Sequence, residues 1–292
     1  MASCRLRHRR GSLWLLGLLV WLVSSGVCAV ETVSATLPSG LGVSAGFQRG
    51  ADSRHAVLVL HGFLTTRHFN TVKSLVAELA DSGYTVLAPT LSLGVPTRSA
   101  STPCDAVHTH TWEDDLQEVD FWVDWLVSRG YESIVLLGHS SGALQLLSYA
   151  VDAPPPEVKG VVATSLVYLR RYTPESVVAR EIALAEELAQ QSPPPLQAYH
   201  LVFCEDFTAT PASYLSYIGW TRERVLALLE RTTLPLEIIM GGADQRFGPD
   251  WRRELSDKGV RVRVVDGASH FFDATHEFEL HDVVRQSMEG IP

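Results

Sequence analysis

The chain has 292 residues and a formal net charge of −9 at neutral pH, with 46% hydrophobic and 20% charged residues. This length and composition are typical of one globular domain and exclude a disordered or collagen-like chain. The acidic balance argues against a nucleic-acid-binding protein, because nucleic-acid affinity depends on basic side chains that neutralise phosphates.

The first 29 residues follow the three-part pattern of a secretory signal peptide. Four arginines stand between residues 5 and 10, an apolar run covers residues 13–23, and Val27-Cys28-Ala29 ends the segment. We predict cleavage after Ala29 and export, to the periplasm or outside the cell. The alternative is an uncleaved membrane anchor, but a spanning helix needs about 20 apolar residues. Cleavage removes four arginines and no acid, which leaves a net charge of −13 and no stable membrane anchor.

Short apolar runs of the kind found in buried strands recur along the rest of the chain. Most are unbroken and aliphatic, which suits strands of a parallel sheet that is covered on both faces. The last one alternates with polar residues, as a strand near the edge of a sheet does. These runs occupy residues 43–47, 56–60, 85–88, 134–137, 158–164, 236–240 and 260–265.

Helical patterns separate the apolar runs. Residues 69–82 carry apolar side chains at helical spacing, and Thr111 can cap a helix that continues to Arg129. Further helices are expected over residues 141–149, 250–258 and 276–287. The alternation of strands and helices predicts an α/β fold with a doubly wound, mostly parallel sheet.

Roughly 70 residues between Ser165 and Leu236 interrupt this alternation. They contain helical patterns over about 173–191, 211–217 and 221–231. Long connections in compact domains are usually functional or disordered, and this one is too apolar for disorder. We therefore interpret about 168–220 as a helical cap insert within a single domain that spans residues 30–292.

The sequence Gly138-His139-Ser140-Ser141-Gly142 matches G-x-S-x-G. It follows a predicted buried strand and opens a predicted helix, which is the strand–turn–helix setting that a nucleophile elbow requires. The sharp turn leaves no room for side chains at the two glycines and holds the serine in a strained backbone conformation. The N-terminus of the helix also places positive partial charge where an oxyanion forms. The pattern indicates that Ser140 is a nucleophile.

Together with the dipeptide His61-Gly62 after an earlier strand, this motif makes residues 43–290 resemble the α/β-hydrolase family. The resemblance implies that the loop after His61-Gly62 forms an oxyanion hole. In it, the backbone N–H groups of Phe63 and Ser141 bind the oxyanion. His61 itself is compatible with a buried packing role and is not assigned a catalytic one.

A serine hydroxyl needs a general base, and the base needs an acid that orients it. In the α/β-hydrolase family the acid and then the histidine follow the serine along the chain. His270 stands just past the last predicted strand, where the family carries its histidine. Asp244 follows the penultimate strand in a loop that resembles the family's G-x-x-D. The resemblance therefore implies a triad of Ser140, Asp244 and His270.

Cys104 and Cys204 are the two cysteines that remain after signal cleavage. An oxidising compartment and two segments expected at the same edge of the sheet predict a disulfide between them, with two free thiols as the alternative. The spacing of Cys104, His108 and His110 could ligate a metal, but no fourth ligand follows at a usual distance. We expect no metal and no cofactor. The segment is interpreted as a rim loop, in which His108 or His110 can meet a polar substrate.

These residues predict a serine hydrolase that cleaves a carboxylic ester of a small molecule through an acyl-enzyme on Ser140. A lipase, a thioesterase or an amidase uses the same triad, so the fold does not decide between them. The remaining alternative is a noncatalytic, hydrolase-like binding protein, although such proteins usually lack a member of the triad.

Overall fold

The structure is a computed structural model, and it describes residues 30–51, 54–152, 154–273 and 275–291. The predicted signal peptide, residues 1–29, lies outside the described residues. Within the described ranges, no helix is both long enough and apolar enough to cross a membrane.

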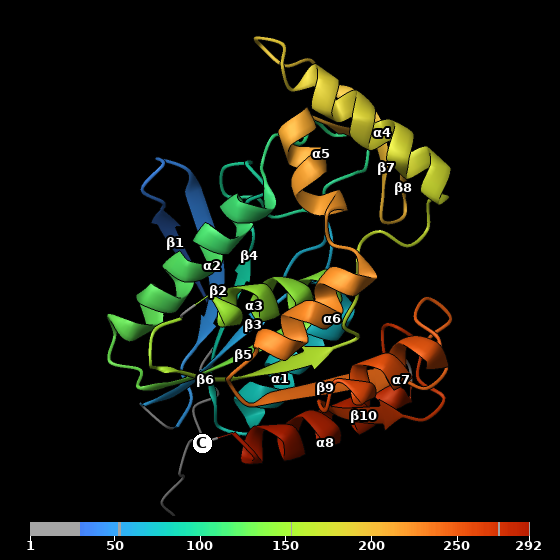
Figure 1. Cartoon of the computed structure of the whole chain (residues 1–292). Coiled ribbons are helices and arrows are strands. Elements are labelled where there is room, and N and C mark those ends of the chain that lie inside the picture. Colours follow the sequence, from blue (N-terminus) through green and yellow to red (C-terminus); the bar gives the residue numbers. More distant parts are fainter. Residues whose placement is uncertain (1–29, 52–53, 153, 274, 292) are drawn as a thin grey trace, which may run out of the picture.

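An eight-stranded sheet forms the centre of the molecule (Figure 1). Its strands are β1 (Glu31–Thr36), β2 (Gly42–Gln48), β3 (His55–Leu60), β4 (Thr85–Thr90), β5 (Ser133–His139), β6 (Val158–Thr164), β9 (Leu236–Gly241) and β10 (Arg261–Val265). They lie in the order β1-β2-β4-β3-β5-β6-β9-β10. All pairs from β4 to β10 are parallel, and β2 is antiparallel to both β1 and β4. The predicted α/β fold with a mostly parallel sheet is confirmed.

Helices cover both faces of this sheet (Figure 1). On one face lie α2 (Trp112–Val127), α3 (Ser141–Val151) and α6 (Arg222–Arg231), on the other α1 (Asn70–Asp81) and α8 (His276–Glu289), and α7 (Pro249–Asp257) packs beside β10. Each face has its own apolar core, and adjacent strand residues such as Val57 and Leu58 enter opposite cores. Burial on both faces explains why the strands appear in the sequence as unbroken apolar runs.

Two elements were not indicated by the sequence patterns. The edge strand β1 is mostly exposed, so its sequence lacks the apolar run that marked the buried strands. The second is a hairpin in the insert, formed by β7 (Gln197–Leu201) and β8 (Cys204–Ala209). Tyr199, Leu201 and Phe207 are buried in it, and this short alternation of buried and exposed residues is a strand signal.

Residues 168–220 stand above the main sheet (Figure 1). Besides the hairpin they contain α4 (Glu175–Leu188) and α5 (Pro211–Ile218), which pack against each other. The third helix of the long interval, α6, lies beyond the segment predicted as the cap and packs on α3 at the face of the sheet.

The rim loop is joined to the hairpin by a disulfide between Cys104 and Cys204, whose Cα atoms are 5.5 Å apart. Backbone hydrogen bonds extend the connection. The N–H of His108 donates to the carbonyl of Thr208 at 2.8 Å, and Thr210 N–H donates to the carbonyl of His108 at 3.0 Å. The loop therefore runs alongside the hairpin as an added strand-like segment.

Candidate active site

Ser140 lies at the sharp turn between β5 and α3, with φ 59° and ψ −123°. This left-handed conformation is rare for a residue with a side chain and marks a strained turn. A Cβ atom at Gly138 would lie 2.5 Å from the backbone nitrogen of Ala143, and one at Gly142 would lie 2.3 Å from the carbonyl oxygen of His61. Both glycines of G-x-S-x-G are therefore required by close backbone contacts.

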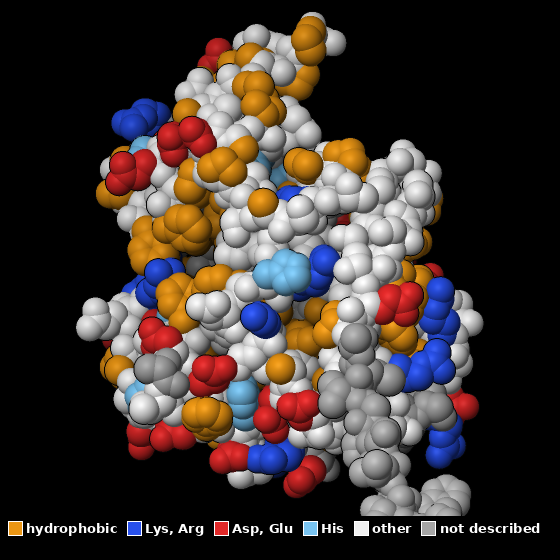
Figure 2. Space-filling view, turned by 180° about the vertical axis from the view of Figure 1, so that it is seen from behind, with side chains coloured by type: hydrophobic (Ala, Val, Ile, Leu, Met, Phe, Trp, Pro, Cys, Tyr) orange, Lys and Arg blue, Asp and Glu red, His pale blue; other side chains and the backbone are white. Residues whose placement is uncertain are grey.

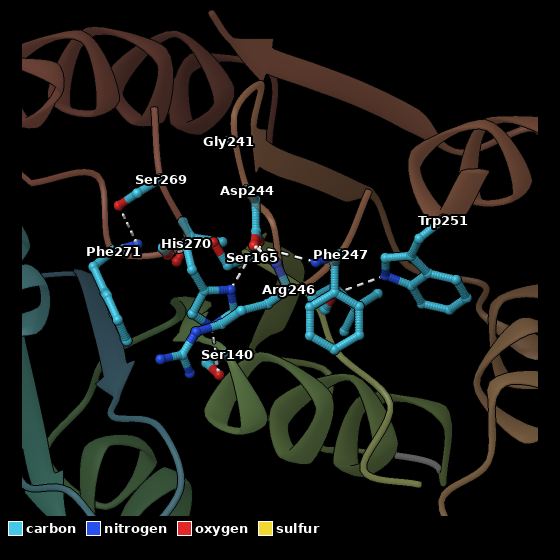
Figure 3. A network of polar contacts seen from close by, with 12 residues as sticks. Ser140, Ser165, Gly241, Asp244, Arg246, Phe247, Trp251, Ser269, His270 and Phe271 are labelled. Atoms are coloured by element: carbon cyan, nitrogen blue, oxygen red, sulfur yellow. Dashed lines mark hydrogen bonds and ion pairs between the residues drawn. The ribbon is translucent and has the colours of Figure 1, made fainter. Parts of the chain in front are cut away.

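Ser140, His270 and Asp244 lie in a row, although each comes from a different loop (Figure 3). The Nε2 atom of His270 is 3.0 Å from the Oγ of Ser140, and its Nδ1 atom is 2.8 Å from Oδ2 of Asp244. The hydrogen-bond pattern assigns the ring proton to Nδ1, which donates to the carboxylate. Nε2 is then free to accept the proton of the serine hydroxyl.

Asp244 is held as a carboxylate by four hydrogen-bond and charge interactions. Its side chain is buried, and burial alone would raise its pKa. The hydrogen bond and charge of His270, with the backbone N–H groups of Arg246 and Phe247, outweigh burial and lower the pKa below its ordinary value. These two N–H groups donate to Oδ1 at 2.8 and 3.2 Å. An ionised Asp244 can orient His270 and stabilise its charged form.

His270 is fixed in place by its surroundings. Its backbone carbonyl accepts a hydrogen bond from Ser165 Oγ at 2.7 Å, and its imidazole lies between the rings of Phe247 and Phe271, at 6.0 and 5.1 Å between centroids. Ser165 directly follows β6, Asp244 follows β9 and His270 follows β10. Segments after three neighbouring strands therefore hold His270 in place.

The neighbouring His139 does not compete for the role of base. Its Nδ1 atom is 3.1 Å from Thr164 Oγ1, while that hydroxyl donates to the carbonyl of Gly138, so His139 is held in the turn. Burial, with the charge of His270, lowers the pKa of His139 well below its ordinary value. The ring therefore stays neutral beside the triad.

Phe63 and Ser141, the two residues implied for the oxyanion hole, both line the cavity that contains Ser140. Neither backbone N–H donates a hydrogen bond to any residue that the structure describes. Unused N–H groups beside a nucleophile are available to an oxyanion, and the N-terminus of α3 adds its partial positive charge there.

Arg98 and His61 anchor the loop that carries Phe63. Arg98 donates to the carbonyls of Thr65 and Leu91, each at 2.7 Å, and His61 Nδ1 donates to the carbonyl of Gly62 at 2.9 Å. His61 Nε2 accepts from the N–H of Leu91 at 3.0 Å. Burial, with the nearby positive charge of Arg98, lowers the pKa of His61 to about 3. His61 is thus a neutral, buried structural residue, and Arg98 is a support that no sequence motif indicated.

The cavity at Ser140 has a volume of about 250 Å³ and mostly apolar walls. Val202 and Phe203, at the tip of the β7–β8 hairpin, overhang it, and the ring of Phe203 packs edge-on against Phe63 at 5.7 Å. The other wall residues are largely aromatic, namely Phe69, Tyr168, Tyr172, Phe247 and Phe271. The hairpin therefore forms part of the wall of the cavity at Ser140, a position that the sequence did not reveal.

His108 and His110 do not meet this cavity. Both are buried, and His108 stacks on Phe207 of the hairpin at 4.1 Å between ring centroids. The expectation that one of them contacts a polar substrate is therefore wrong, because the rim loop turns them towards the cap. Cys104 is bonded to Cys204, and no group of three metal-ligating side chains is found within the described ranges.

Comparison with known families agrees with this geometry. The model of the alpha/beta hydrolase family matches residues 57–285. The protein belongs to the alpha/beta hydrolase family. The matched range contains Ser140, Asp244 and His270 of this alpha/beta hydrolase, and family membership supports a hydrolase activity. No curated protein shows significant sequence similarity to the chain.

Solved structures share the fold of this alpha/beta hydrolase. Est1E from Butyrivibrio proteoclasticus is 16% identical, with a TM-score of 0.63 over 89% of this chain and 98% of its own. The Pyrococcus furiosus esterase Pf2001 is 17% identical, with a TM-score of 0.61 over 90% of each chain. A thioesterase domain from the curacin biosynthetic pathway is 16% identical, with a TM-score of 0.60 over 88% of this chain and 99% of its own. At these identities the likeness establishes the fold.

Proposed function

We propose that this alpha/beta hydrolase is a serine esterase that cleaves a carboxylic ester of a small molecule through an acyl-enzyme on Ser140. The observation that carries the proposal is the unbroken row of contacts from Asp244 through His270 to Ser140 in an apolar cavity. A strained serine whose hydroxyl lies within hydrogen-bond distance of an imidazole nitrogen is the arrangement that activates a hydroxyl nucleophile.

In this mechanism Ser140 Oγ attacks the ester carbonyl carbon while its proton passes to Nε2 of His270. The backbone N–H groups of Phe63 and Ser141 hold the oxyanion of the tetrahedral intermediate. His270 then gives the proton to the departing alcohol oxygen, which leaves the acyl group on Ser140. Water attacks the acyl-enzyme with His270 again as base, and the carboxylic acid is released.

A thioester substrate is the second candidate, because the same steps cleave it and a thioesterase domain is among the structural neighbours. The two candidates differ only in the leaving group. An oxygen ester and a thioester with the same acyl chain therefore separate them by the ratio of kcat/KM values.

The test is hydrolysis of short-chain chromogenic esters by the purified protein and two variants. Ser140→Ala and Asp244→Asn should each lower kcat by about a thousandfold or more, since triad residues act as a unit. Asp250→Asn is the matched control, because Asp250 lies exposed on α7 with Arg253 as its partner at 2.8 Å. Ester hydrolysis that persists in Ser140→Ala would refute the mechanism, and a folded protein that cleaves no ester or thioester would favour a noncatalytic binding role.

We also propose that the protein is exported through residues 1–29. The disulfide between Cys104 and Cys204 supports this, because such bonds persist in oxidising compartments. The first strand, β1, begins at Glu31, so cleavage after Ala29 would leave the whole sheet intact.

A further inference from the structure

Arg246 occupies a position in the active site that the proposed mechanism does not use. It follows Asp244 by two residues in the loop after β9 and lines the cavity together with Ser140 and His270. Figure 3 shows its side chain running past His270, so that the guanidinium lies between Ser140 and Phe271. The charged group is therefore close to the place where a bound ester would react.

The guanidinium of Arg246 has no anionic partner within the described ranges. Its central carbon lies 4.7 Å from the ring centroid of Phe271, which holds the group by a cation–π contact. No ion pair and no side-chain hydrogen bond joins Arg246 to another described residue, although the side chain is half-buried. A guanidinium has five N–H donors, and leaving them unpaired in a partly apolar site is unfavourable.

Arg171 places a second positive charge behind two residues of the cavity wall, Phe247 and Tyr168. Its guanidinium carbon lies 4.8 Å from the ring centroid of Phe247, and its Nη1 donates to the hydroxyl of Tyr168 at 3.0 Å. It too makes no ion pair with a described carboxylate. Both arginines act electrostatically on Tyr172. Burial raises the pKa of its hydroxyl, and the charges of Arg246 and Arg171 lower it.

The lack of an ion pair distinguishes Arg246 and Arg171 from two arginines close to them. The whole chain is acidic, with a net charge of −9, and neighbouring arginines such as Arg170 and Arg222 are each paired with a glutamate. Figure 2 shows hydrophobic side chains gathered beside a hollow beneath the cap, with basic side chains next to them. Unpaired positive charge beside an apolar cavity attracts and orients anions.

We propose that the ester substrate of this site carries an anionic group, a carboxylate, that Arg246 binds while Arg171 strengthens the local positive potential. A guanidinium binds a carboxylate through two parallel hydrogen bonds, which also fixes the orientation of the substrate. The inference rests on the proposed serine esterase function and narrows its substrate class. The carboxylate can belong to the acyl part or to the alcohol part of the ester.

Two matched pairs of esters test the inference and distinguish these sources. The acyl pair is the para-nitrophenyl ester of hexanoic acid and the para-nitrophenyl monoester of adipic acid. The alcohol pair is the butyrate esters of para-hydroxybenzamide and para-hydroxybenzoate. For each pair, the ratio of kcat/KM for the anionic ester to that for the neutral ester is measured, after subtraction of the rate without enzyme.

The wild-type ratio should exceed one in at least one pair and should fall by about tenfold or more in Arg246→Gln, since charge-assisted hydrogen bonds are strong. Arg246→Lys keeps the positive charge but cannot form two parallel hydrogen bonds with a carboxylate. Its ratio should lie between those of the wild type and Arg246→Gln. The matched control is Arg253→Gln on α7, an exposed arginine paired with Asp250, whose ratio should stay within about twofold of wild type. Because both esters are measured on the same sample, partial misfolding of a variant cancels in the ratio.

Hydrolysis of the neutral esters with no preference for either anionic partner would overturn the inference and leave the esterase function standing. A preference that Arg246→Gln does not reduce would overturn it as well. If the wild-type protein cleaves none of the four esters, the proposed function fails and the inference fails with it.

Discussion

The role of each buried histidine depends on the partners of its two ring nitrogens. His270 is the proposed base because one ring nitrogen faces Asp244 and the other faces Ser140, whereas His61 and His139 are held by backbone or threonine oxygens. His110 is buried without a partner for its Nδ1 atom among the described residues. Burial, with the nearby His108, lowers the pKa of His110 from its ordinary 6.5 to about 3.

This shift predicts how His110 affects stability. Between pH 6.5 and about 3 the unfolded chain binds a proton at His110 that the folded protein does not bind. The contribution of a neutral His110 to the free energy of unfolding is therefore complete above pH 6.5. It is lost as the pH falls towards 3.

His110→Phe, which cannot bind the proton, should reduce the acid sensitivity of the free energy of unfolding. From pH 6.5 down to pH 4, the wild-type value should fall more steeply than that of the variant, by up to about 1.4 kcal/mol per pH unit. Denaturant unfolding at a series of pH values measures the slope of the free energy of unfolding against pH for each protein. His110→Asn replaces His110→Phe if the larger ring of phenylalanine does not fit. Parallel slopes would show that His110 is protonated in the folded protein.

The three residues of the proposed triad, which the structure brings together, carry a sequence signal, but the residue proposed to select the substrate does not. Ser140, Asp244 and His270 each stand in a loop that follows a strand, and two of these loops carry motifs whose spacing reflects backbone geometry. Arg246 has no such signal. Its proposed role depends on the path of the loop after Asp244 and on the lack of an ion-pair partner for its guanidinium among the described residues, which only the fold determines.

At the level of secondary structure, the cap is where sequence reasoning was weakest. Buried strands were evident as apolar runs, and Thr111 marked the start of α2, where the structure shows a capping box with Asp114. The β7–β8 hairpin was missed because its strands are short and its buried residues touch the rim loop and α5 rather than the main sheet. The contacts with the rim loop join segments distant in sequence, which no local pattern reveals, and the alternation within the hairpin is a short signal.

The disulfide between Cys104 and Cys204 should be a substantial stabiliser of this cap. It spans a sequence separation of 100 residues, and a loop of that length is worth about 4.7 kcal/mol in the chain-entropy model. The double variant Cys104→Ser/Cys204→Ser should lower the free energy of unfolding by about 2–5 kcal/mol. The free energy of unfolding of the wild-type protein, measured in the presence of a reductant, should match that of the double variant. Two titratable thiols in the denatured, unreduced protein that lacks residues 1–29 would contradict the bond.

At the scale of the whole molecule, the proposed export makes a prediction about the N-terminus of the mature protein. We predict that the mature protein begins at Val30, one residue before β1. N-terminal sequencing of protein recovered outside the cytoplasm tests this prediction. Recovery of the intact chain from Met1, held in the membrane fraction, would instead support the uncleaved anchor.

The central claim is that Ser140 is a nucleophile activated by His270. Fluorophosphonates phosphonylate serines of this kind, and peptide mass spectrometry identifies the residue that carries the adduct. The native protein should carry one adduct on the peptide that contains Ser140, whereas Ser140→Ala and heat-denatured wild-type protein should carry none. Natively folded wild-type protein that remains unlabelled at Ser140, or that is labelled at another serine, would contradict the account.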